Sequence, residues 1–139
     1  MNQYDNIKTR GYNHPLALII KAFVEFNKGN YSECLSIYKQ IMNDNPRCPP
    51  SIRFAMGLCY YRIGNIEKAR VAFERLLELE PDNHLAMVAL AIVESNASYI
   101  DKNARERGAI LLEKAYQIEP NEPITLKYMA EHYFSIKEY

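Results

Sequence analysis

The sequence has no excess of charge of either sign and no apolar run long enough to cross a bilayer. Its 139 residues include 17 Lys plus Arg and 17 Asp plus Glu, so the formal net charge is zero. A neutral chain lacks the basic field that attracts phosphate backbones and anionic lipids, which argues against direct binding of nucleic acid or a membrane surface. A spanning helix needs about 20 apolar residues, and the most apolar stretch, residues 16–26, is interrupted by Lys21 and Glu25. The N-terminus also lacks the basic-then-apolar order of a signal peptide.

Motifs typical of catalytic, phosphate-binding or metal-binding sites are also absent from the sequence. The three cysteines, Cys34, Cys48 and Cys59, are odd in number and widely spaced, which favours a reducing intracellular compartment over a disulfide framework. The three histidines form no HExxH motif, and the five glycines form no phosphate-binding loop. No CxxC or Cys/His spacing indicates a metal site. We therefore predict a protein that is not an enzyme, with no catalytic residues, no cofactor and no metal.

The sequence does contain an internal repeat. Three segments end alike, as YKQIMNDNP at Pro46, FERLLELEP at Pro81 and LEKAYQIEP at Pro120, and these prolines are 35 and 39 residues apart. A unit of about 34 residues that ends in proline is typical of tetratricopeptide (TPR) repeats. The middle unit resembles this family most closely, because Gly57, Tyr60, Ala69 and Phe73 occupy the expected positions before Pro81. Small residues such as Gly57 and Ala69 allow two antiparallel helices to approach closely.

The resemblance implies an all-α fold, a TPR α-solenoid of antiparallel helix pairs with about three and a half repeats in a right-handed superhelix. Residues 1–14 are expected to form a tail or linker, and residues 15–139 the array. The repeats are expected near 15–48, 50–83 and 84–122, followed by a truncated repeat at 123–139, and the third repeat has an insertion at 95–108 that forms a longer turn or an extended helix. Because the last repeat lacks its second helix, we expect the chain to be part of a longer array. The predicted helices lie near 15–28, 31–44, 50–63, 66–79, 83–97, 103–118 and 122–136.

Two sets of residues follow from the repeat alignment. The structural positions are small or bulky packing residues: Ala22, Cys34, Tyr38, Pro46, Gly57, Tyr60, Ala69, Phe73, Pro81, Ala91, Ala115, Pro120 and Ala130. The first helix of each pair lines the concave side of such an array, which gives the predicted partner-binding positions: Phe23, Phe26, Phe54, Leu58, Tyr61, Arg62, Val88, Ile92, Asn96, Lys127, Glu131 and Phe134.

The residue types on the predicted concave face distinguish two kinds of TPR protein. Co-chaperone TPR domains hold a carboxylate with Lys, Asn and Arg, whereas several of these positions here are apolar, including Phe54, Leu58, Val88 and Ile92. Apolar side chains offer no donors to a carboxylate. The face therefore suits an apolar peptide segment or a helix. An equally good interpretation is that it packs against neighbouring repeats or the N-terminal tail, and open solenoid ends would also allow self-association.

A closer resemblance covers about residue 15 to the end of the chain. The stretch NPRCPPSIRFAMGLCYYRIGNIEKARVAFERLLELEPDNHLAMVALAIVESN, residues 45–96, is similar to the TPR scaffold subunit of the RNA polymerase II-associated Paf complex. Cys48, Arg53 and Cys59 make this specific, because TPR packing does not demand them. The resemblance implies a nuclear scaffold in transcription elongation and co-transcriptional histone modification, and the partner would be an extended or helical segment of another Paf-complex subunit. The alternatives are a cytosolic TPR adaptor for peptides or chaperones, and a regulatory TPR region of a larger enzyme.

Overall fold

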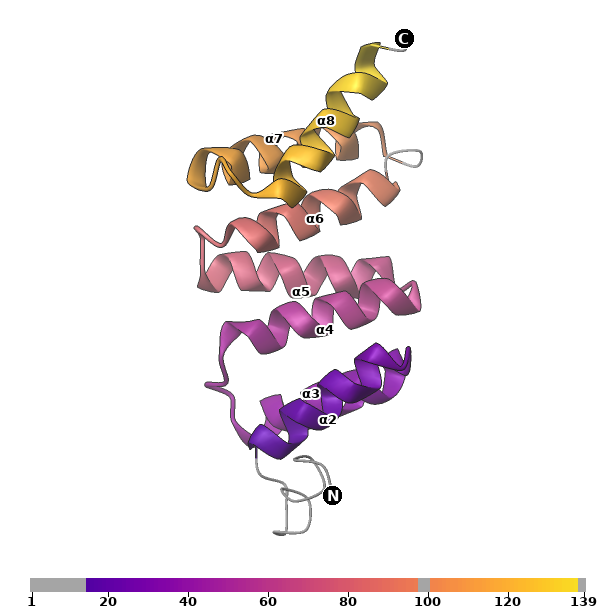
Figure 1. Cartoon of the computed structure of the whole chain (residues 1–139), viewed down its shortest axis with the longest axis vertical. Helices are drawn as coiled ribbons and strands as arrows, with labels where there is room; N and C mark the ends of the chain where they lie inside the picture. The colour runs from indigo at the N-terminus through magenta and orange to yellow at the C-terminus, as the bar shows by residue number, and fades with distance from the viewer. Residues whose placement is uncertain (1–14, 98–100, 138–139) are drawn as a thin grey trace. The chain divides into compact units, whose positions relative to one another are not determined.

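The computed structural model describes residues 15–97 and 101–137, and it describes no side chains for Ala97 and residues 134–137. These residues form seven helices and no strands (Figure 1). The helices are α2 (Pro15–Asn27), α3 (Tyr31–Asp44), α4 (Pro50–Ile63), α5 (Ile66–Leu79), α6 (His84–Ala97), α7 (Lys102–Ile118) and α8 (Pro123–Lys137). Every bound lies within one residue of the predicted one, so the all-α prediction is confirmed. The predicted tail at residues 1–14 lies outside the described residues.

Glycine and proline set the helix ends. The backbone of Gly29 has a φ of 82° and that of Gly64 a φ of 96°, values that favour glycine because it has no Cβ. The Gly64 N–H donates to the carbonyls of Tyr60 and Tyr61, which closes α4. Pro50 and Pro123 begin α4 and α8, where a missing N–H costs nothing.

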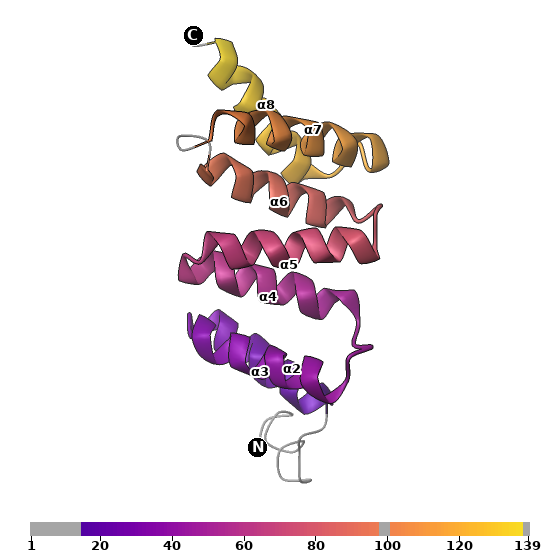
Figure 2. The same cartoon turned by 180° about the vertical axis from the view of Figure 1, so that it is seen from behind.

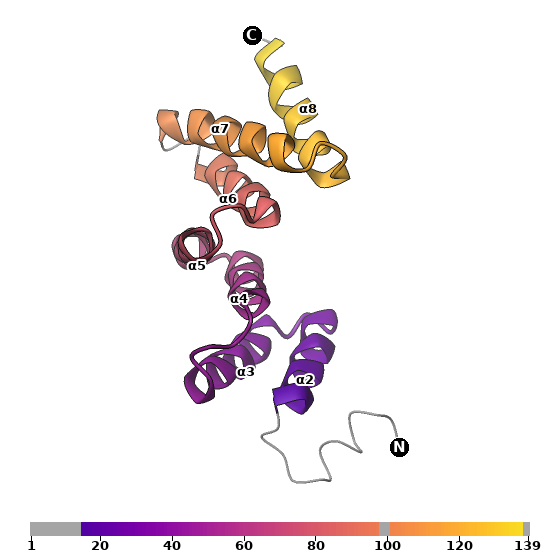
Figure 3. The ribbon, with the colours of Figure 1, turned by 90° about the vertical axis from the view of Figure 1, so that its left-hand side faces the viewer.

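The chain consists of two compact units, Met1–Ala69 and Arg70–Tyr139, and each is described by itself. In the first unit α3 packs against α2 and against α4 (Figure 3). A core cluster of aliphatic residues, two cysteines and one tyrosine joins these three helices. Its members are Leu18, Ala22, Cys34, Leu35, Ile37, Tyr38, Ile41, Ile52 and Cys59.

The core of the first unit contains a pair of thiols that the spacing of the cysteines did not reveal. Cys34 of α3 and Cys59 of α4 are both fully buried, and the Cys59 Sγ donates to the Cys34 Sγ at 3.4 Å. Burial raises the pKa of the Cys34 thiol, and it raises the pKa of Cys59 to about 12. Both thiols therefore stay protonated and act as small apolar packing groups.

In the second unit α6 lies beside α7, and α8 packs against both and runs at an angle to α7 (Figures 1 and 2). Its core cluster consists of Met87, Val88, Ala91, Leu112 and Ala115. The last part of the predicted insertion, residues 102–108, belongs to α7, which has 17 residues while α3 to α6 have 14 each. The side chain of Asp101 accepts from the Asn103 N–H and caps this helix.

Most of the predicted structural positions within the helices are buried, whereas Ala130 and the three turn prolines are exposed. Ala22, Ala69 and Ala115 are fully buried, and Phe73 is 1% exposed. Ala130 is exposed instead, because no helix follows α8 among the described residues to cover it. The packing role of Ala130, which needs the second helix of its repeat, stays a prediction. Pro46, Pro81 and Pro120 lie in the turns after α3, α5 and α7.

We expect Ala69→Leu to lower the free energy of unfolding by about 1–3 kcal/mol, because added methylenes overpack a fully buried position. Val71→Leu on the same helix is the control, since Val71 is 60% exposed and the change should stay within about 0.5 kcal/mol. Urea denaturation of both variants measures the difference. Equal midpoints for the two variants would contradict the packing role assigned to Ala69.

We also expect a thiol reagent such as DTNB to modify Cys48 in the native chain and to leave Cys34 and Cys59 intact until denaturant is added. Only the thiolate reacts, and the raised pKa values keep the two buried thiols protonated even near pH 9. Cys48 is only partly buried and should account for the fast phase. Cys48→Ser should abolish this phase, and three equal rates in the native chain would refute the burial of the pair.

Candidate functional site

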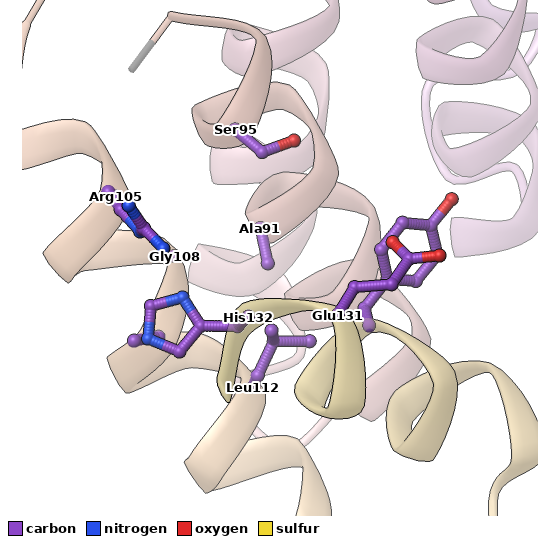
Figure 4. Close-up of a pocket in the computed structure, with 9 residues that line it drawn as sticks. Ala91, Ser95, Arg105, Gly108, Leu112, Glu131 and His132 are labelled. Carbon is purple, nitrogen blue, oxygen red and sulfur yellow. The ribbon is translucent and has the colours of Figure 1, made fainter. Parts of the chain in front are cut away.

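The second unit contains a pocket of about 370 Å³ between α6, α7 and α8 (Figure 4). Ala91 and Ser95 come from α6, and α7 contributes the largest share of the wall. Three residues of α8, Tyr128, Glu131 and His132, close the remaining side. The lining residues are Ala91, Ser95, Arg105, Gly108, Ala109, Leu112, Tyr128, Glu131 and His132.

Small and aliphatic residues form the apolar part of the pocket. Ala91 is 5% exposed and Leu112 6% exposed, and both belong to the core cluster of this unit. A Cβ added to Gly108 would lie 3.4 Å from the Ala91 carbonyl oxygen and 3.7 Å from the Glu94 Cβ. These are ordinary van der Waals distances, so Gly108 lies at the contact of α7 with α6, and Ala109 beside it adds little volume to the pocket wall.

Four polar side chains, those of Ser95, Arg105, Glu131 and His132, complete the lining. The Ser95 hydroxyl donates to the Ile92 carbonyl at 2.7 Å. Burial, followed by the charge of Arg105, lowers the pKa of His132, although Glu113 opposes the shift. The imidazole is therefore neutral at neutral pH, and the formal charges of Arg105 and Glu131 balance each other.

An ion cluster centred on the buried Glu94 connects α7 to α6 and α5. Glu94 of α6 is 4% exposed and accepts from the Arg70 Nε at 3.1 Å and the Arg107 Nη2 at 2.7 Å. Arg107 also donates to Asp101 at 2.9 Å. This hydrogen bond, together with the Asn103 N–H, lowers the pKa of Asp101. The cluster thus joins α5, α6 and the start of α7 next to the pocket.

The structure places the predicted partner-binding residues of the second unit in different environments. Glu131 lines the pocket. Ile92 is half-buried against the core cluster, and Asn96 is exposed with its amide donating to the Ile92 carbonyl. Lys127 is exposed, with its Nζ 5.5 Å from the centre of the Tyr128 ring. The side chain of Phe134 lies outside the described residues.

The prediction for Val88 needs correction. Val88 is 3% exposed and belongs to the core cluster of the second unit, so it cannot contact a partner of this folded unit. Val88 lies on α6, which is buried along most of its length. Both α7 and α8 pack against this helix. Counting positions within a repeat does not reveal how deeply a helix is covered.

The predicted partner-binding positions of the first unit do not line the pocket, because all of the pocket's residues belong to the second unit. Phe23 is 64% exposed, whereas Phe26 packs against the core cluster and makes an edge contact with Tyr31 at 5.1 Å between ring centres. Arg62 is exposed. The remaining three residues, Phe54, Leu58 and Tyr61, are half-buried.

Sequence reasoning missed most of the pocket. Arg105, Gly108, Ala109 and Leu112 belong to or follow the polar stretch that was taken as an insertion. One signal was present, because Ala104, Gly108 and Leu112 recur every four residues and mark the buried face of a helix. His132, one of the three histidines that form no HExxH motif, is half-buried in the pocket wall.

Within the described residues, no group of three or more His, Cys, Asp or Glu side chains is placed to hold a metal ion. Among the helices of residues 15–97 and 101–137, none is long and apolar enough to cross a membrane.

Comparisons with known proteins identify a repeat and a set of relatives. A family model described as "Tetratricopeptide repeat" matches residues 50–83. The chain is 42% identical over 118 residues to "Protein CTR9 homolog" of Arabidopsis thaliana, a match that covers 85% of this chain and 11% of that protein. It is 29% identical to "RNA polymerase-associated protein CTR9" of Caenorhabditis elegans over 98% of this chain and 12% of that protein. The chain therefore spans about a tenth of the length of these curated relatives.

Solved structures resemble the chain in fold. The Sgt2 TPR domain from Aspergillus fumigatus matches with a TM-score of 0.76 and 17% identity, covering 91% of this chain and 82% of that one. The first TPR of Spaghetti (RPAP3), bound to an HSP90 peptide, matches with a TM-score of 0.73 and 18% identity, covering 88% of this chain and 93% of that one. At these identities the likeness concerns the fold alone.

We expect Glu94→Gln to lower the free energy of unfolding by about 1–3 kcal/mol, because it removes a buried carboxylate that accepts two charged hydrogen bonds. Glu78→Gln is the matched control, since the Glu78–Arg75 pair is exposed on both sides and should contribute at most about 1 kcal/mol. Chemical denaturation of both variants tests the difference. Similar losses for the two would show that burial of Glu94 does not strengthen its ion pairs.

Proposed function

This chain carries a tetratricopeptide repeat and has the all-α TPR fold, and we propose that it is a non-catalytic, protein-binding part of a nuclear scaffold. The scaffold would be a Paf-complex subunit that acts in RNA polymerase II transcription elongation and co-transcriptional histone modification. The observation that carries the proposal is the 42% identity to a CTR9 homologue over 85% of this chain. A match of this extent goes well beyond the few small and bulky positions that TPR packing requires.

The pocket supports a role in binding protein segments. It is formed by three helices, has an apolar interior and has polar groups at its edge, which is the usual composition of a ligand site in proteins. The partner would be an extended or helical segment of another subunit of the same complex. The neutral composition of the chain agrees with a protein partner and not with nucleic acid.

The chaperone-adaptor alternative has weaker support. The resemblance to the TPR of Spaghetti bound to an HSP90 peptide concerns the fold, at 18% identity. In this chain Phe54, Leu58 and Ile92 are apolar and half-buried at positions where carboxylate-binding TPR domains would present donors. Without donors the ionised end of a chaperone peptide would lose its hydration without compensation.

The test is affinity purification of the tagged, full-length parent protein from cell nuclei, followed by mass spectrometry with lysine crosslinking. We expect RNA polymerase II and elongation factors among the co-purified proteins. Crosslinks from Lys102 or Lys127, which are exposed on α7 and α8, should then map the partner segment beside the second unit. A matched purification with the tag alone sets the background.

Recovery of chaperones and cytosolic proteins in place of polymerase would overturn the nuclear role. The TPR fold would be unaffected by that result, because it rests on the structure of the chain and not on the partner. An enzymatic activity of the purified chain toward its own partner would contradict the non-catalytic role.

A further inference from the structure

We propose that the pocket between α6, α7 and α8 binds one large, uncharged side chain, aromatic or aliphatic, from an extended segment of a partner protein. This inference rests on the proposed function and makes it more specific, because it states which class of side chain a protein-binding site of this kind accepts.

The first argument is the size and lining of the pocket. Its volume of about 370 Å³ lies at the lower end of the range of roughly 300–1,000 Å³ found for ligand pockets, so it suits one side chain and its adjoining backbone. Ala91, Gly108, Ala109 and Leu112 expose carbon to it, and the Tyr128 ring forms part of the wall. An aromatic or aliphatic group gains apolar burial in such a space, and an aromatic group can also stack against Tyr128.

The second argument is the balance of charge at the edge. Figure 4 shows Arg105 and Glu131 on opposite sides of Ala91, with Ser95 above it and His132 below it, and all four side chains line the pocket. A carboxylate or phosphate drawn toward Arg105 would also meet Glu131, and an ammonium group would meet Arg105. Like charges brought together in an interface lower the affinity, so this edge disfavours both anionic and cationic groups of a partner.

An uncharged peptide backbone matches this edge better than an ion does. The Glu131 carboxylate can accept hydrogen bonds from the N–H groups of such a backbone. The neutral imidazole favoured by burial adds no further charge to the opening. The occupant is therefore an apolar side chain whose flanking amides lie along the polar edge.

The experiment is an NMR titration of the ¹⁵N-labelled 139-residue chain with three capped amino acids. They are N-acetyl-phenylalanine amide, N-acetyl-glutamate amide and N-acetyl-lysine amide. We expect saturable shifts of the amide signals of Ser95, Gly108 and Ala109 with the phenylalanine probe. Its affinity should exceed that of both charged probes by about tenfold, since burial of an aromatic ring is worth roughly 1.5 kcal/mol or more.

Two variants connect the signal to the pocket. Ala109→Leu fills the pocket from α7, and Ser95→Tyr covers it from α6, so each should abolish the saturable shifts. Gln117→Leu is the control, because Gln117 is exposed on α7 and does not line the pocket. It should leave the affinity for the phenylalanine probe unchanged. Circular dichroism of each variant checks that the helices form, and the two blocking variants lie on different helices so that one can replace the other.

Three results would overturn the inference. They are preferential binding of the glutamate probe, preferential binding of the lysine probe, and the absence of saturable shifts at these residues with the phenylalanine probe. None of them affects the proposed function, which co-purification of the parent protein tests separately. If instead the phenylalanine probe binds but polymerase does not co-purify, the side-chain preference stands and the proposed nuclear role fails.

Discussion

The buried carboxylate of Glu94 is the constraint on which the second unit depends. It lies at the contact of α6 and α7, where its desolvation is costly unless charged donors replace water. Arg70 and Arg107 supply these donors from helices on two sides, and Arg107 extends the cluster to Asp101 at the start of α7. The extra turn of α7 therefore has a defined position. The ion pairs of Arg107 also position the pocket wall, because the wall residues Arg105 and Gly108 lie near Arg107 in the sequence.

The same contact explains why the pocket has an apolar interior. Gly108 lies where α7 contacts α6 at Ala91, and a Cβ at this position would lie 3.4 Å from the Ala91 carbonyl oxygen. Small residues at a helix contact shorten the distance between two helices but add little volume beside it. The third helix, α8, runs at an angle to α7 (Figure 1). Its residues Tyr128, Glu131 and His132 line the pocket next to this contact. The ion pairs of Glu94 and the small residues at the contact of α6 and α7 thus lie side by side along the same two helices.

The sequence predicted the helices well and the site poorly, for physical reasons that differ. Helix ends depend on local chemistry such as the left-handed Gly64 and the first-turn Pro50 and Pro123, which can be recognised from neighbouring residues. The pocket depends on side chains 41 residues apart in the chain, Ala91 and His132, whose proximity follows from helix packing. Burial depth is equally non-local. Val88 occupies a position assigned to the concave face, yet the second unit buries it.

Two apolar features of the second unit have different physical origins. Ile124, Leu126 and Tyr133 of α8 are between 44% and 49% exposed, and the Tyr133 hydroxyl donates to Glu113 at 3.3 Å. Exposed apolar side chains on a helix are what stacked repeats cover in one another. The pocket is concave instead, and Arg105 and Glu131 at its edge would be poorly hydrated beneath a packed helix. A single side chain on an extended strand fills the interior and leaves these charges in contact with water. The geometry of the edge thus favours a peptide segment in the pocket over a neighbouring repeat.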